Sequence, residues 1–258
     1  MTTQNDPKDQ PRLPAVVDAA TWQAARDELM EREKAHMRDG DSIAAARRRL
    51  PMVEVDGTVG VVGADGPVPF IDLFQDRDEL LVHKHMWHDG TPFEGQCMGC
   101  TINTWHIQRS APYLRARGVS FAVATEGPWD EVGPFVEFMG YDEPWYSVRG
   151  LAWPVGEDMG PVASFLRDGD RVYFTYATVS RGTEVASGAF ALLDMTPYGR
   201  RESWQETPAG WPDGHDSCWF WRTDADGVPT LGPTGRPVAQ WTRPEATPII
   251  EGPGHSFR

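Results

Sequence analysis

Cations, cysteines and long apolar runs are all scarce in this chain of 258 residues. Lys and Arg number 24 against 38 Asp and Glu, which gives a formal net charge of −14. This balance argues against a nucleic-acid partner and against a polybasic membrane anchor, because both depend on clustered cations. No stretch reaches the ~18 uninterrupted apolar residues of a membrane span. The first residues are polar and do not resemble a signal peptide, so we expect a cytoplasmic protein without a membrane partner.

Three cysteines are too few for a disulfide scaffold in a chain of this length. Two of them, Cys97 and Cys100, form a C-x-x-C pair. In a reducing compartment this spacing indicates redox or metal chemistry rather than a structural bridge. Cys218 has no partner at a useful spacing, and we expect it to be a packed cysteine.

The composition divides the chain into four parts. Residues 1–18 carry little to bury and predict a disordered tail. Residues 19–51 predict a helical extension, and residues 52–200 carry the main domain. Residues 201–258 are rich in Gly, Pro and Trp without periodicity, which predicts an irregular tail. Because its tryptophans are costly to expose, we expect this tail to pack on the domain or to form a homo-oligomer with a partner subunit.

The helical extension is rich in Ala, Leu, Glu, Lys and Arg, with apolar residues at helical spacing. Thr21 is the expected N-cap and Pro51 the expected stop. Gly40 predicts a break between two helical segments.

In residues 52–200 strands alternate with helices. Short extended pieces at 52–62 and 68–74, divided by Asp-Gly turns, predict an antiparallel lead-in, that is, short antiparallel strands that precede the central part of the domain. The segment LLVHKHMW at 80–87 predicts a buried central strand. Later segments predict helices over 100–118, 128–140 and 184–195, a strand over 119–125, a short extended piece at 144–148 and a hairpin over 163–179. This order indicates an α/β fold with a mixed sheet.

Several long blocks of the sequence carry a family resemblance. In chain order they are RRRLP, GPVPFIDLF, GQCMGC, RGVSFAV, FLRDGDRVYFTYAT and LLDMTPYGR. Over most of residues 20–200 the chain resembles the domain-of-unknown-function family numbered 899, whose members are described as predicted dithiol-disulfide oxidoreductases. The resemblance implies a thioredoxin-like mixed sheet flanked by helices. Thioredoxins place a cis-proline before the strand that faces the active site, and Pro161 is the nearest candidate, displaced by one residue.

A C-x-x-C pair at the start of a helix is suited to thiol chemistry. Unpaired backbone N–H groups and the positive end of the helix dipole favour a thiolate at Cys97, which makes it the expected attacking sulfur. Cys100, three residues later, is close enough to displace a mixed disulfide formed at Cys97. The alternative interpretation is that Cys97 and Cys100 are buried, inert cysteines with a structural role only.

Three histidines precede the C-x-x-C loop. On a strand, His83 and His85 point to one face, and His88 lies just past the strand end. With the thiolates of Cys97 and Cys100 they could form a mixed nitrogen and sulfur site for copper or zinc. The alternative is that they are polar residues of a cleft, or that one of them is a satisfied core histidine.

The leading hypothesis is a thiol-disulfide oxidoreductase or thiol peroxidase that needs no cofactor. Its substrate would be a disulfide or a peroxide, and an external thiol would regenerate it. The alternative is a copper or zinc protein, such as a metal-dependent oxidase of a small aromatic substrate. A third hypothesis is a non-catalytic binding module. The sequence carries no phosphate-binding or dinucleotide-binding motif, so a nucleotide cofactor is not expected.

Overall fold

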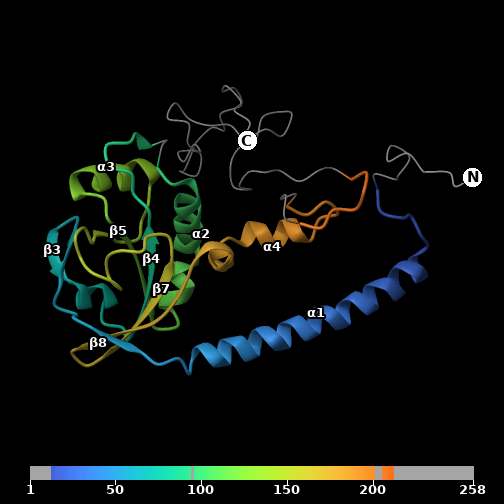
Figure 1. Ribbon diagram of the computed structural model, residues 1–258, viewed down its shortest axis with the longest axis horizontal. Coiled ribbons are helices and arrows are strands. Elements are labelled where there is room, and N and C mark those ends of the chain that lie inside the picture. The colour runs from blue at the N-terminus through green and yellow to red at the C-terminus, as the bar shows by residue number, and fades with distance from the viewer. Residues whose placement is uncertain (1–12, 94–95, 201–204, 212–258) are drawn as a thin grey trace, which may run out of the picture. The chain divides into compact units, whose positions relative to one another are not determined.

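The computed structural model describes residues 13–93, 96–200 and 205–211. Predictions for the first twelve residues, for most of the tail and for Cys218 fall outside these described residues. The described residues divide into two compact units, 13–51 with 206–211, and 52–93 with 96–200 and 205 (Figure 1). None of the described helices is both long enough and apolar enough to cross a membrane.

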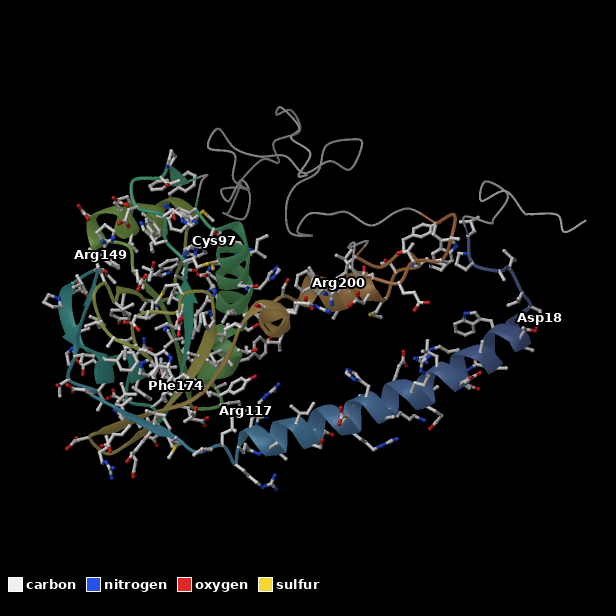
Figure 2. All side chains as sticks on the ribbon, in the orientation of Figure 1. Asp18, Cys97, Arg117, Arg149, Phe174 and Arg200 are labelled. Atoms are coloured by element: carbon white, nitrogen blue, oxygen red, sulfur yellow. The ribbon has the colours of Figure 1, made fainter. Side chains whose placement is uncertain are left out.

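Helix α1, Ala19–Arg47, is continuous. Its N-cap is Asp18, labelled in Figure 2, whose carboxylate accepts a hydrogen bond from the backbone N–H of Thr21 at 2.8 Å. The prediction of Thr21 as N-cap is therefore wrong by three residues. The predicted break at Gly40 is also wrong, because one glycine costs a helix only about 1 kcal/mol, which the surrounding helix formers outweigh.

The second unit contains one sheet of eight strands in its described residues, in the order β1-β8-β7-β4-β5-β6-β2-β3. The strands are β1 (Val53–Val55), β2 (Gly60–Gly63), β3 (Gly66–Pro69), β4 (Glu79–His85), β5 (Val119–Thr125), β6 (Trp145–Ser147), β7 (Val162–Asp168) and β8 (Arg171–Thr178). The helical elements are η2 (Phe70–Phe74), α2 (Met98–Arg115), α3 (Trp129–Met139), η4 (Ser180–Ala186) and α4 (Gly188–Asp194).

The topology is thioredoxin-like. Strand β4 leads through α2 to β5, which pairs parallel with it. The hairpin β7–β8 then returns on the other side, with β7 antiparallel to β4. These four strands form the centre of the mixed sheet, in the order β8-β7-β4-β5. The predicted α/β fold with a thioredoxin-like mixed sheet flanked by helices is confirmed.

Three local predictions need correction. Strand β1 pairs with β8 instead of joining an antiparallel lead-in with β2. Residues 70–74, predicted as extended, form η2, because Phe70, Leu73 and Phe74 are buried at helical rather than alternating spacing. The single helix predicted over 184–195 is two short ones, η4 and α4, which the extended backbone of Ser187 separates.

Successive side chains of β4 point to opposite faces of the sheet, so neighbouring residues pack against different parts of the core. Leu80 and Val82 belong to the core cluster that includes η2, and Lys84 follows them on the same face. His83 and His85 point to the opposite face, where α2 and α3 pack. The central strand therefore carries a lysine on one face and two histidines on the other.

Candidate active site

The thiol pair lies at the start of α2. Cys97 is the N-cap residue, and its side chain makes no capping hydrogen bond. Its carbonyl oxygen accepts the backbone N–H of Thr101 at 2.9 Å and the hydroxyl of Thr101 at 2.8 Å. Cys97 is half-buried, whereas only 4 % of Cys100 is exposed. Cys97 is thus the more accessible of the two sulfurs, at the positive end of an 18-residue helix.

The two thiols are electrostatically unequal. The pKa of Cys100 is raised well above its usual value, first by its hydrogen bond to the Cys97 side chain, then by burial and by the charge of Cys97. The backbone N–H of Met86 opposes this shift. Cys100 therefore keeps its proton at neutral pH and can donate it toward the sulfur of Cys97.

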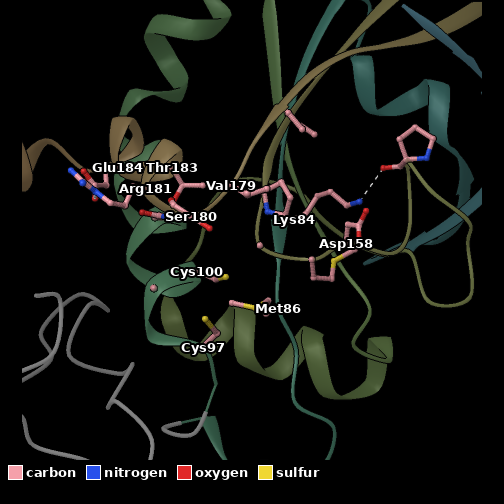
Figure 3. Close-up of a pocket in the computed structure, with 18 of the residues that line it drawn as sticks. Lys84, Met86, Cys97, Cys100, Asp158, Val179, Ser180, Arg181, Thr183 and Glu184 are labelled. Carbon is pink, nitrogen blue, oxygen red and sulfur yellow. Dashed lines mark hydrogen bonds and ion pairs between the residues drawn. The ribbon is translucent and has the colours of Figure 1, made fainter. Parts of the chain in front are cut away.

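A cavity of about 760 Å³ lies beside the pair, and both cysteines contribute to its wall (Figure 3). Figure 3 shows their sulfur atoms in yellow, on the side of the cavity where Met86 lies. Residues of η4 form another side, including Ser180 and Arg181. The large apolar side chains of the wall include those of Met86, Trp153, Met159, Phe174, Val179 and Phe190.

Lys84 also lines this cavity, although sequence reasoning did not single it out. Only 3 % of it is exposed. Its ammonium donates to the carbonyl oxygen of Pro154 at 3.0 Å (Figure 3) and to that of Gly156 at 2.9 Å. Burial lowers the pKa of Lys84, and the charge of Asp158 is the largest influence that opposes this shift. The signal in the sequence was a lone lysine inside an otherwise buried strand, a position that requires paired polar groups.

Lys84 holds the segment 151–160 through its backbone as well. Its N–H donates to the carbonyl of Pro161 at 2.9 Å, and its carbonyl accepts the N–H of Gly160 at 2.6 Å. This segment contains the cis peptide bond found in the described residues, Trp153–Pro154, so the proline predicted as the cis candidate, Pro161, does not carry it. Lys84 therefore fixes one wall of the cavity that contains the thiols.

His83 and His85 are fully buried beneath α2. A ring nitrogen of His83 lies 2.8 Å from the hydroxyl of Thr104, and one of His85 lies 3.4 Å from that of Thr101. Burial lowers the pKa of His83 to about 3 and that of His85 well below its usual value. The ring of His85 packs at 5.0 Å from that of Trp145. Both imidazoles are thus neutral core groups at neutral pH.

The metal hypothesis requires one or more of His83, His85 and His88 to lie beside the thiols of Cys97 and Cys100. Instead, the alternation of β4 directs His83 and His85 into the core, and His88 lies beyond the strand, where its backbone bonds the side chain of Gln96. Within the described residues, no three His, Cys, Asp or Glu side chains are grouped to hold a metal ion. The structure does not assemble the predicted set of Cys97, Cys100 and the three histidines, and metal binding stays a prediction.

The strand order defines a thioredoxin-like fold, in which the thiol pair lies at the start of the helix that follows the central strand β4. The model of the family described as "Bacterial protein of unknown function (DUF899)" matches residues 11–226. The chain belongs to that family, as its sequence blocks indicated. No curated protein matches the chain.

Solved structures with partial similarity include thiol enzymes. Peroxidoxin BcpB from Mycobacterium tuberculosis is 16% identical, with a TM-score of 0.36 over 51% of this chain and 87% of its own. Peroxiredoxin Q from Xanthomonas campestris is 13% identical, with a TM-score of 0.37 over 56% and 94%. A secreted disulfide oxidoreductase from Mycobacterium tuberculosis is 14% identical, with a TM-score of 0.30 over 53% and 96%. Similarity at this level does not transfer an activity.

Proposed function

We propose that the protein is a dithiol-disulfide oxidoreductase in which Cys97 attacks and Cys100 resolves. One observation carries the proposal: a half-buried cysteine caps α2 at the wall of a cavity, beside a buried cysteine whose thiol pKa is raised. A pair of inert core cysteines would need neither the helix start nor the access to a cavity. The proposal presupposes a reducing compartment, such as the cytoplasm, that supplies an external thiol.

The chemistry divides into two exchanges. The thiolate of Cys97 attacks one sulfur of a substrate disulfide, and the substrate's sulfur–sulfur bond breaks as the first thiolate product leaves. Cys100 then loses its proton and attacks the sulfur of Cys97 in the mixed disulfide. This step releases the second product and leaves a Cys97–Cys100 disulfide, which an external dithiol reduces. A peroxide would use the same pair, with a sulfenic acid at Cys97 in place of the mixed disulfide.

Redox equilibration of the full chain, in mixtures of reduced and oxidised dithiothreitol and of reduced and oxidised glutathione, tests the proposal. The Cys218→Ser protein serves as background, because it leaves Cys97 and Cys100 as its cysteines. We expect a reversible two-electron transition in which both thiols disappear together, with loss of two hydrogens by mass. Cys97→Ser in the same background should abolish the transition. A dithiol that resists oxidation across the whole range would contradict the proposed function.

A further inference from the structure

The cavity beside the thiols has the size of a small-molecule site. Its volume of about 760 Å³ falls within the roughly 300–1,000 Å³ typical of ligand pockets. A protein substrate would instead require an exposed contact surface of about 800 Å² on each partner around the reacting sulfur. Cys97 is half-buried within the cavity wall, so a small disulfide can reach it more readily than a disulfide held on a folded protein.

The wall of the cavity is suited to an apolar group. Trp153 is 46% exposed, Val179 is 55% exposed and Met86 is 37% exposed, although all three are large apolar side chains. Trp153 meets the ring of Phe174 edge-on, with ring centroids 5.2 Å apart. Exposed apolar side chains that gather around a cavity mark a binding site, because a ligand that covers them removes apolar surface from water.

The positively charged side chains of the cavity wall already interact with carbonyl oxygens or carboxylates of the protein. The ammonium of Lys84 donates to two carbonyl oxygens and faces the charge of Asp158. The guanidinium of Arg181 lies 3.0 Å from the carboxylate of Glu184. A charged substrate would have to compete with these contacts, whereas a neutral one leaves them intact.

We infer that the substrate is a neutral, low-molecular-weight disulfide with apolar arms, one of which the cavity encloses while its sulfur faces Cys97. This inference rests on the proposed function and specifies its substrate class. Attack by the Cys97 thiolate forms a bond to the enclosed sulfur, breaks the substrate disulfide and releases the other arm as a thiolate that takes a proton from water. Cys100 then expels the enclosed arm as the second thiol. The substrate gains two electrons, the protein dithiol loses two, and an added dithiol restores it.

The test compares disulfides that differ in their arms and have similar alkyl thiol leaving groups. The full chain, with dithiothreitol as reductant, is assayed with dibenzyl disulfide, bis(2-hydroxyethyl) disulfide, oxidised glutathione and insulin, each corrected for its uncatalysed rate. We expect kcat/KM for dibenzyl disulfide to exceed that of the other three by about tenfold or more, which corresponds to ~1.4 kcal/mol of added binding in the transition state. Equal values, or a preference for insulin, would overturn the inference.

Substitutions in the cavity wall test whether this wall causes the preference for apolar arms. Ala177→Leu narrows the cavity and Trp153→Ala removes an exposed apolar wall, so each should lower the ratio of the dibenzyl to the hydroxyethyl rate. Ala46→Leu, on the exposed side of α1, is the matched control and should leave the ratio unchanged. Circular dichroism verifies that each variant is folded. If Ala177→Leu does not fold, the Trp153→Ala protein alone decides the test. An unchanged ratio in a folded Trp153→Ala protein would also overturn the inference.

The two proposals fail in different ways. If Cys97→Ser retains turnover of bis(2-hydroxyethyl) disulfide, the dithiol function itself is wrong. If turnover of this small substrate depends on Cys97 but apolar arms give no advantage, only the substrate class is wrong.

Discussion

Cys97 caps α2 and is half-buried, whereas Cys100, three residues later, is 4 % exposed, and its interaction with the Cys97 side chain is the largest cause of its raised pKa. This difference in burial and pKa assigns unequal roles to two chemically identical residues. Cys100 holds the proton, and Cys97, capping α2, is the sulfur that meets a substrate first.

Alkylation of the native reduced protein should reveal this inequality. With iodoacetamide at pH 7, Cys97 is expected to react at least about tenfold faster than Cys100, because the thiolate is the reactive form and only 4 % of Cys100 is exposed. Peptide mass spectrometry of time points measures both rates. In urea the two rates should converge, which serves as the control. Preferential labelling of Cys100 in the native protein would refute the assignment.

Lys84→Met should loosen the segment over the cavity. The substitution keeps the length of the side chain but leaves the carbonyls of Pro154 and Gly156 without their donor, so we expect a loss of about 1–3 kcal/mol in the free energy of unfolding. Hydrogen exchange of the amides in residues 151–160 should accelerate as well. Lys34→Met on α1, half-exposed in its salt bridge, is the control. Unchanged exchange in Lys84→Met would show that the lysine does not hold this segment.

The buried His83 predicts a pH dependence of stability. Its pKa is lowered from 6.5 to about 3 in the folded state, so between these values the unfolded chain binds a proton that the folded chain does not. The contribution of neutral His83 to the free energy of unfolding is fully present above pH 6.5 and is lost as the pH falls toward 3. Over this window the free energy of unfolding changes by up to roughly 1.4 kcal/mol per pH unit. Urea unfolding of wild type and His83→Gln across this window measures it. The variant should lose the steeper part of the slope, and identical slopes would contradict the burial argument.

Copper titration tests the remaining role of the histidines. Reduced protein titrated with Cu(I) against a competing chelator should give the same affinity for wild type, His85→Ala, His88→Ala and the control His36→Ala, because the ring of His85 is buried against Trp145 and His88 lies beyond the end of β4. Elemental analysis of protein purified without chelator complements the titration. Weaker binding confined to His85→Ala or His88→Ala would favour the copper or zinc hypothesis.

Much of the domain could be predicted from the sequence, because its strong patterns are local. The apolar runs at 80–87 and 119–125 predict β4 and β5, and the turn at Asp168-Gly169-Asp170 predicts the β7–β8 hairpin. The partner of β1 could not be read in this way, because a strand of three residues carries no signal for a partner more than a hundred positions away.

Only part of the candidate site could be predicted from the sequence. The thiol pair has a recognisable spacing, whereas the cavity is formed by segments far apart in the chain, among them Trp153 and Val179. His83 and His85 share a face, as their spacing indicates, but the spacing does not say that this face is the core beneath α2. Lys84 was overlooked between them, since its partners are backbone carbonyls that no sequence pattern marks.

Trapping of the intermediate is the most direct test of the central claim, that Cys97 attacks and Cys100 resolves. Reduced Cys100→Ser protein, in the Cys218→Ser background, is mixed with bis(2-hydroxyethyl) disulfide and measured by intact mass spectrometry, with Cys97→Ser as the matched control. We expect a stable adduct of one substrate thiol on Cys97 in the Cys100→Ser protein, because the resolving sulfur is absent. The Cys97→Ser control should form no adduct, because the attacking sulfur is absent. An adduct on Cys100 in the Cys97→Ser protein, with none on Cys97 in the Cys100→Ser protein, would contradict the central claim.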